Sequence, residues 1–161
     1  TLRPAFKSDG TITAANASSI SDGASALVLT RESNLNGRAP LARIVAHTTH
    51  SIHPSEFTLA PIGAIEKLLE KTGWSADSVD LFEINEAFAM VTMLTMQALN
   101  LPHEKVNIYG GACAQGHPIG STGSRLIVTL AHALQQHDRQ RGIAALCIGG
   151  GEATAVALER A

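Results

Sequence analysis

Charged residues are scarce in this sequence. Asp, Glu, Lys and Arg make up 16% of its 161 residues, against roughly 25% in typical soluble domains. These charges are too few to coat the surface of a free-standing domain generously. Two explanations stay open: close packing of Ala-rich elements, or a surface that another domain or subunit covers.

Other absences exclude classes of function. The formal net charge is -2, aromatic residues are only 4% of the chain, and no Lys/Arg stripe is interleaved with them, which argues against nucleic-acid binding. The chain has no apolar run of the roughly 18 residues that a membrane span needs, and no basic-plus-apolar signal segment at its start. We expect a soluble, cytoplasmic protein without nucleic acid or membrane among its partners.

Cysteine is also rare. Cys113 and Cys147 lie far apart and form no CxxC pair, so we expect neither a disulfide scaffold nor a thiolate zinc site. His47, His50 and His53 repeat every three residues, but their segment reads as strand and loop. We therefore expect no metal site, and two reduced thiols.

Apolar patterning predicts alternating strands and helices. A polar stretch at 31–40, which carries Gly37 and Pro40, marks a boundary or crossing loop. After it, the pattern indicates an α/β fold with a mixed five-stranded sheet and helices on both faces. The expected strands are 25–30, before the boundary, and 41–49, 79–84, 105–111, 143–151 and 153–160; the expected helices are 61–73, 86–100 and 121–136.

Three reactive or polar residues fall at the ends of these elements. Asn85 follows a strand, His117 precedes a helix in a glycine-rich turn, and Cys147 ends a strand before three glycines. In open α/β sheets, ligands collect outside the carboxyl ends of strands. The turn is not a nucleotide site, because His follows Gly116 where a phosphate loop needs Lys, and G-x-G-x-x-G is absent.

Each residue also has a structural explanation. His117 could be a turn histidine that faces solvent or a backbone carbonyl, and Cys147 a small core hydrophobe. Asn85 could cap a helix, and Glu86 could favour the N-terminus of that helix through its dipole. Cys113, between two alanines, fits a packing role better than a chemical one.

Four segments together resemble the thiolase family. They are "LRPAFKSDGTITAANASSISDGA" (2–24), "NEAFA" (85–89), "GGACAQGHPIGSTGSR" (110–125) and "CIGGGEATAVALER" (147–160), in the order and approximate spacing of that family. The similarity covers essentially the whole chain. It implies a thiolase-like C-terminal domain and, within the family, the type that acts on acetyl groups.

The resemblance implies an acyltransferase of fatty acid metabolism. Coenzyme A thioesters would be its substrates, no further cofactor would be needed, and the reaction would be a reversible Claisen condensation or thiolytic cleavage of a 3-ketoacyl-coenzyme A. Two alternatives remain: a thiolase-like lipid or sterol carrier without turnover, and a hydrolase in which Cys147 is the nucleophile paired with His117.

The resemblance also implies roles for individual residues. His117 would activate the acyl-accepting thiol and help to bind the thioester oxygen, while Asn85 would hold a water that completes this oxyanion site. Cys147 would move the proton on and off the acetyl carbon, a task that suits a thiol of depressed pKa. Gly149 would donate its N–H to a second oxyanion.

Two further residues would bind coenzyme A. Ser18 would contact its pantetheine arm, and Phe88 would line the channel of that arm. Ser19 and Ser21 depart from the family pattern "NASGxNDG", and Tyr109 stands where Asn is frequent.

The acyl-accepting cysteine of the family lies in its N-terminal half, and nothing in this chain matches that block. Residues 1–40 would be the remnant of the loop region and the end of the N-terminal domain, and residues 41–161 the C-terminal domain. The missing half would pack against this chain and cover its charge-poor surface. We expect a homodimer or homotetramer for the full-length protein, and negligible activity for the 161 residues alone.

Overall fold

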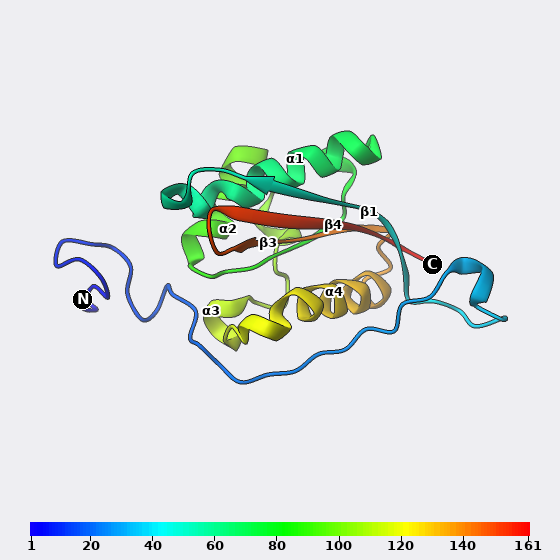
Figure 1. Cartoon of the computed structure of the whole chain (residues 1–161), viewed down its shortest axis with the longest axis horizontal. Coiled ribbons are helices and arrows are strands. Elements are labelled where there is room, and N and C mark those ends of the chain that lie inside the picture. The colour runs from blue at the N-terminus through cyan, green and yellow to red at the C-terminus, as the bar shows by residue number, and fades with distance from the viewer.

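One mixed β-sheet organises the chain. The computed structural model describes residues 1–161, and in it the sheet lies between two layers of helices (Figure 1). The strand order is β1-β4-β3-β2, with β2 parallel to β3 and the other pairs antiparallel. The strands are β1 (Ala42–Ser51), β2 (Leu81–Ile84), β3 (Arg141–Ile148) and β4 (Glu152–Arg160).

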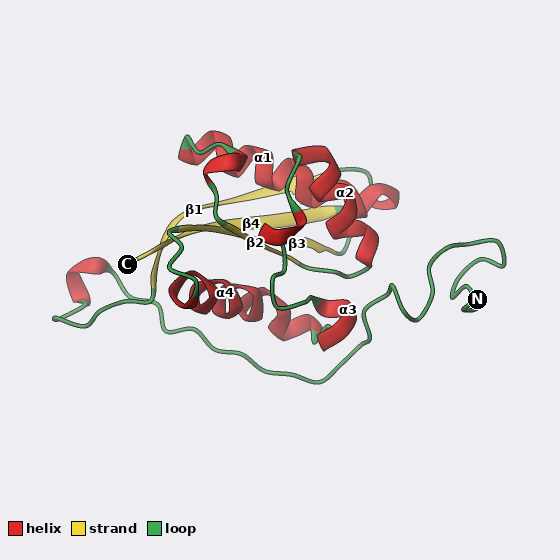
Figure 2. Ribbon diagram, turned by 180° about the vertical axis from the view of Figure 1, so that it is seen from behind, coloured by secondary structure: helices red, strands yellow, loops and turns green.

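Helices cover both faces of this sheet, which confirms the predicted α/β class (Figure 2). On one side lie α1 (Ala60–Thr72) and α2 (Ala89–Leu99), and on the other α3 (Ala112–Gln115) and α4 (Ile119–Gln136). None of them has the length and apolar character to cross a membrane. Four short 3-10 helices join the elements: Glu32–Asn34, Pro54–Leu59, Ala76–Ser78 and His103–Lys105.

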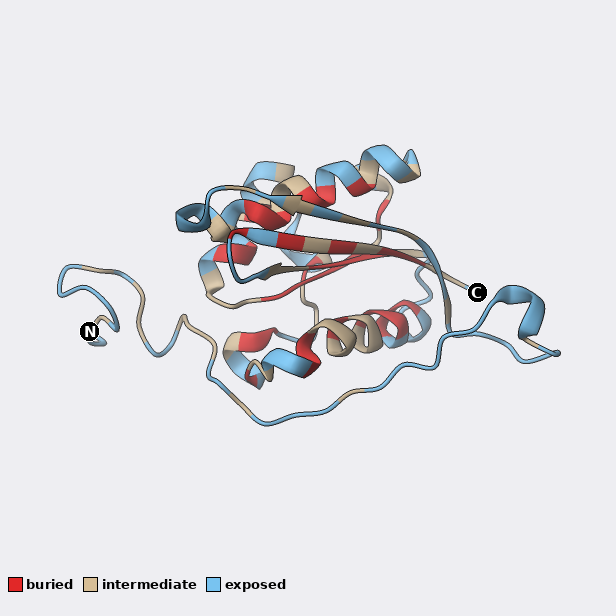
Figure 3. Cartoon of the chain, viewed as in Figure 1, coloured by how far each residue is buried: buried red, intermediate tan, exposed pale blue.

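The core is divided into two layers by the sheet. Side chains alternate along β4, so that Ala153, Ala155 and Ala157 are fully buried in the layer under α1. Their small size lets α1 approach the sheet closely. On the other face, leucines of α4 pack against β2, β3 and β4, and the inward faces of both helix layers are buried (Figure 3).

The prediction of a strand over 105–111 is wrong, and the sheet has four strands rather than five. Only one bridge, from Phe82 to Val106, joins this segment to β2. Asn107 then turns left-handed, with φ 48°. Its side chain accepts from the Ile84 N–H at 2.8 Å and donates to the Ile84 carbonyl at 2.8 Å. The Asn107 side-chain amide therefore bonds the backbone groups of Ile84 that a fifth strand would otherwise pair with.

The prediction of a strand over 25–30 is also wrong. This segment runs extended outside α4 without a strand partner (Figure 1). Ser25 attaches it, since its Oγ lies 2.7 Å from Ser121 Oγ and 2.5 Å from Ser124 Oγ. Beyond this point Val28 is 98% exposed and Leu29 70% exposed. The apolar residues that suggested a buried strand have nothing in this chain to cover them.

The end of α1 depends on the backbone freedom of Gly73. This residue is left-handed, with φ 71°, and its N–H and that of Trp74 bond back to the last turn of the helix. A Cβ at Gly73 would meet nothing within 4 Å. The conformation, not space, therefore requires glycine.

We expect Gly73→Ala to lower the free energy of unfolding by about 1 kcal/mol, because Ala pays the left-handed penalty that Gly avoids. Gly73→Asn, which tolerates this conformation, should lose clearly less. Urea denaturation of the two variants measures the difference. Equal losses would contradict the conformational explanation.

Candidate active site

The site begins where β2 and β3 end together. Because these strands are parallel and pair Ile84 with Ala145, their carboxyl ends lie at the same edge of the sheet. The Asn85 N–H continues the ladder by donating to the Ala145 carbonyl at 2.9 Å. Asn85 is fully buried there, and Cys147 follows two residues after Ala145.

A glycine turn brings His117 to this edge. Gly116 is left-handed, with φ 91°, and a Cβ at this position would lie 2.3 Å from Ser21 Oγ. The turn can therefore press against the N-terminal segment, and the His117 N–H donates to the Ser19 carbonyl at 2.9 Å. A tight turn and a close approach both require glycine here.

The imidazole of His117 is held by two side chains. Its Nε2 lies 3.3 Å from Asn85 Nδ2, and its Nδ1 lies 2.7 Å from Thr122 Oγ1. Burial, and then the positive charge of Arg125, lowers the pKa of His117 below its ordinary value. The ring is therefore neutral at neutral pH and has a lone pair that can accept a proton.

His117, Cys147 and Gly149 line one cavity of about 250 Å³. Its other walls are mostly apolar: Phe57, Ala87, Ile119, Leu146 and Ile148. Burial raises the pKa of the Cys147 thiol, so the expectation of a depressed pKa is wrong for this chain. Burial therefore favours the protonated thiol over the thiolate at Cys147.

A second cavity, of about 510 Å³, lies beside the first, with Phe57 in the walls of both. Phe88 lines it and makes edge contacts with Phe6 and Phe57, at 6.1 and 6.2 Å between ring centroids. Ser18 is close by: its hydroxyl donates to the Ala87 carbonyl at 2.9 Å. A largely apolar cavity thus adjoins the cavity of His117.

A buried ion pair lies near this site. Arg125 Nη1 on α4 is 3.4 Å from Glu83 Oε2 on β2, and Glu83 is only 2% exposed. Burial raises the pKa of Glu83 to about 7, with Glu86 adding to the effect and Arg125 opposing it. The positive charge of Arg125 is the same one that helps to lower the pKa of His117.

The structural explanations for Asn85 and Glu86 fail. The helix begins at Ala89, with Phe88 as its N-cap, three residues later than predicted, because Phe88 stays extended and the Ala89 N–H bonds to the N-terminal segment. Asn85 therefore caps nothing. Glu86 instead accepts from the Cys113 N–H at 3.1 Å, so Cys113 has a polar neighbour after all.

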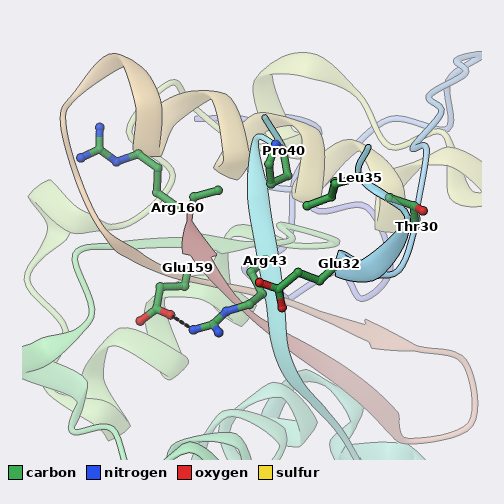
Figure 4. A pocket seen from close by; sticks show the side chains of 8 residues that line it. Thr30, Glu32, Leu35, Pro40, Arg43, Glu159 and Arg160 are labelled. Atoms are coloured by element: carbon green, nitrogen blue, oxygen red, sulfur yellow. Dashed lines mark hydrogen bonds and ion pairs between the residues drawn. The ribbon is translucent and has the colours of Figure 1, made fainter. Parts of the chain in front are cut away.

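Nothing comparable assembles elsewhere. No three His, Cys, Asp or Glu side chains are arranged to hold a metal ion. Near the C-terminus a polar cavity of about 280 Å³ contains Glu32, Arg43 and Glu159, with Arg43 paired to Glu159 (Figure 4). Arg160, also in its wall, pairs with Asp138 at 2.8 Å. Both arginines are thus paired with carboxylates, and no predicted site residue lines this cavity.

Comparison with known proteins decides the family. Residues 38–160 match "Thiolase, C-terminal domain" and residues 1–33 match "Thiolase, N-terminal domain". The chain belongs to the thiolase family. Among relatives, this thiolase chain is 49% identical over 161 residues to a probable acetyl-CoA acetyltransferase of Dictyostelium discoideum, covering 99% of this chain and 39% of the relative.

A mouse relative, "Acetyl-CoA acetyltransferase, cytosolic", is 49% identical over 163 residues, which is 99% of this chain and 41% of the relative. The crystal structure of the Bacillus anthracis acetyl-CoA acetyltransferase superposes with a TM-score of 0.97 at 44% identity, covering 99% of this chain and 41% of the other. The crystal structure of human mitochondrial 3-ketoacyl-CoA thiolase in complex with CoA superposes with a TM-score of 0.92 at 38% identity. This match covers 100% of this chain and 41% of the other. The chain thus spans about two fifths of these thiolases.

Sequence reasoning missed several neighbours of the site. Thr122 touches the His117 ring, Phe57 lines both cavities, and Glu83 pairs with Arg125. Thr122 alone had a signal, since it lies one helical turn past Pro118 in the motif around His117. The others come from distant segments, and nothing in their own sequence context points to the site.

We expect the Glu83 carboxyl to make stability pH-dependent. Its pKa is about 7 in the folded chain and near the ordinary value of 4.5 when unfolded. Its contribution is therefore complete below pH 4.5 and is lost as the pH rises through 7, by roughly 3 kcal/mol at most. Glu83→Gln should flatten the dependence of unfolding free energy on pH between 5 and 7.

Urea denaturation of the full-length protein at several pH values measures this slope. The control is Glu66→Gln, which removes an exposed glutamate from α1 and should leave the slope unchanged. A wild-type slope in Glu83→Gln would show that this carboxyl ionises at its ordinary pH.

Proposed function

We propose that this chain supplies the C-terminal half of the active site of an acetyl-coenzyme A acetyltransferase. The enzyme would condense two acetyl-coenzyme A molecules, or cleave a 3-ketoacyl-coenzyme A with free coenzyme A. One observation carries the proposal: His117, bonded to Asn85, shares a cavity with Cys147 and Gly149. These are the residues that the thiolase motifs match, gathered from three separate segments.

In the first half-reaction His117 is the base. Its neutral ring takes the proton from the acyl-accepting thiol of the N-terminal half, and the sulfur attacks the thioester carbonyl. The carbon–sulfur bond to coenzyme A then breaks, and the departing sulfur takes the proton from His117. Asn85 assists at the developing oxyanion. In support, Asn85 Oδ1 is buried without a hydrogen-bond partner in this chain, and such an atom usually has a water or a ligand to bind.

In the second half-reaction Cys147 and Gly149 act on the acetyl carbon. The Cys147 thiolate removes a proton, and the enolate attacks the acyl-enzyme, so that a carbon–carbon bond forms while the carbon–sulfur bond to the enzyme breaks. The Gly149 N–H stabilises the second oxyanion, and such a donor can be worth roughly 3 kcal/mol in the transition state. Burial raises the pKa of Cys147, which lowers the fraction of thiolate but makes that thiolate a stronger base for the acetyl carbon.

The adjoining channel suits the pantetheine arm of coenzyme A. Phe88 and its neighbouring rings give it apolar walls. Ser18 donates to the carbonyl of Ala87, which lines the cavity of His117 and precedes Phe88 in the chain. The CoA complex of the human relative belongs to a protein of closely similar fold. We propose Ser18 and Phe88 as contacts of coenzyme A, the only organic group that the reaction needs.

The N-terminal half would complete the enzyme. We place the division near residue 40, with 1–40 belonging to the N-terminal domain and its loop region and 41–161 forming the C-terminal domain. Ile20, Val28 and Leu29 are 90%, 98% and 70% exposed, as expected of a surface that the missing half covers. We propose a homodimer or homotetramer as the working form, and a cytosolic location, which the name of the cytosolic mouse relative supports.

Neither alternative explains the site as well. A lipid or sterol carrier has no need of Asn85, His117 and Cys147 together. A hydrolase with Cys147 as nucleophile would need this thiol bonded to His117, but the two side chains line the same cavity without a hydrogen bond between them.

The first test is turnover. The full-length protein should cleave acetoacetyl-coenzyme A with free coenzyme A, and the 161-residue chain alone should not, because the acyl-accepting thiol lies outside it. The thioester and enolate absorbances report the reaction. Substantial turnover by the chain alone would overturn the divided site, and an inactive full-length protein would favour the carrier.

The second test distinguishes the role of the Cys147 thiol from that of the acyl-accepting thiol. In the full-length protein, Cys147→Ala should keep transfer of the acyl group to the enzyme but abolish hydrogen–deuterium exchange at the acetyl carbon, seen by mass spectrometry. Cys113→Ala is the matched control, since its thiol lines neither cavity, and should retain both steps. Exchange at the wild-type rate in Cys147→Ala would remove this thiol from the mechanism.

A further inference from the structure

Thr122 holds the His117 ring at Nδ1, the nitrogen that Asn85 does not contact. It lies in the first turn of α4 and is fully buried. Its Oγ1 is 2.7 Å from His117 Nδ1 and 3.0 Å from the Pro118 carbonyl oxygen. The hydroxyl thus bridges the imidazole and the helix backbone.

The positions of the hydrogens at this bridge follow from the donors and acceptors that each group has. A hydroxyl has one hydrogen, and the Pro118 carbonyl can only accept. A helical threonine commonly donates to the carbonyl four residues earlier, which here is that of Pro118. Thr122 then presents a lone pair to His117, so that Nδ1 must carry the ring hydrogen and donate it.

The other side of the ring agrees with this assignment. Asn85 Nδ2, a donor, lies 3.3 Å from His117 Nε2. A neutral imidazole has one N–H, and burial together with Arg125 favours the neutral ring. With the hydrogen on Nδ1, the Nε2 lone pair meets the amide hydrogens of Asn85. The opposite tautomer would set two donors against each other.

We propose that Thr122 is a positioning residue that fixes His117 as its Nδ1–H tautomer and so keeps Nε2, on the Asn85 side of the ring, as the basic nitrogen. The inference rests on the proposed function, in which Nε2 takes the proton of the acyl-accepting thiol. Without the hydroxyl, the ring can rotate or change tautomer, and only a fraction of molecules keep the base correctly aimed. Thr122 itself touches no substrate.

The kinetic test uses the full-length protein and the near-isosteric Thr122→Val. We expect kcat for cleavage of acetoacetyl-coenzyme A to fall by about tenfold to a hundredfold, part of the contribution of a general base, with KM changed less than twofold. Thr122→Ser, which keeps the hydroxyl, should recover most of the loss. A wild-type kcat in Thr122→Val would overturn the proposal.

Thr95 provides a matched control. It too is fully buried in a helix and donates to the carbonyl four residues earlier, that of Val91, at 2.8 Å. Thr95→Val therefore removes the same kind of backbone bond without touching His117. Its kcat should stay near wild type, and a fall equal to that of Thr122→Val would assign the effect to helix packing.

Nitrogen-15 NMR of ring-labelled histidine tests the tautomer directly. The His117 signals, identified by their loss in His117→Gln, should show a protonated Nδ1 and an unprotonated Nε2 in the wild type, and an altered ratio in Thr122→Val. A wild-type ring protonated at Nε2 would overturn the proposal. This reading does not need turnover, so failure of the proposed function would show separately, as an inactive wild-type protein.

Discussion

The parallel pairing of β2 with β3 is the constraint on which the site depends. Antiparallel neighbours would have their carboxyl ends at opposite edges, but here Asn85, just after β2, and Cys147, near the end of β3, lie at the same edge. β2 has apolar residues on both faces, Leu81 on one and Phe82 and Ile84 on the other, and its fourth residue, Glu83, is buried as well. A short, wholly buried strand thus sets the positions of two polar groups that lie just beyond it.

The second requirement is a low-dielectric surrounding for His117. The ring lies at the start of α4, half-buried, with a cation on the same helix and an amide on the neighbouring strand end. Each neighbour acts on the same property, the readiness of one nitrogen to take a proton: burial and Arg125 keep the ring uncharged, and hydrogen bonds fix its orientation. In such an environment small displacements have large electrostatic effects.

Much of this arrangement could be read from the sequence, and the reasons for the failures are physical. The helices α1 and α4 and the strands β1, β3 and β4 have clear periodicity, and the site residues sit at predictable element ends. Residues 105–111 look like a strand because their apolar pattern says nothing of Asn107, whose amide replaces the ladder. Residues 25–30 look buried because most of their side chains are apolar, but nothing in this chain covers them. Glu83 and Arg125 meet only through tertiary packing, which no local pattern encodes.

The amide of Asn107 also has a consequence for association. β2 is the edge strand on its side of the sheet, and an edge with free N–H and C=O groups can recruit a strand from another molecule. The two bonds from Asn107 to Ile84 occupy such groups at the end of that strand, and the Phe82 carbonyl accepts from the Asn107 N–H at 2.9 Å. Asn107 therefore occupies backbone groups on the free edge of β2 that a strand from another molecule would otherwise pair with.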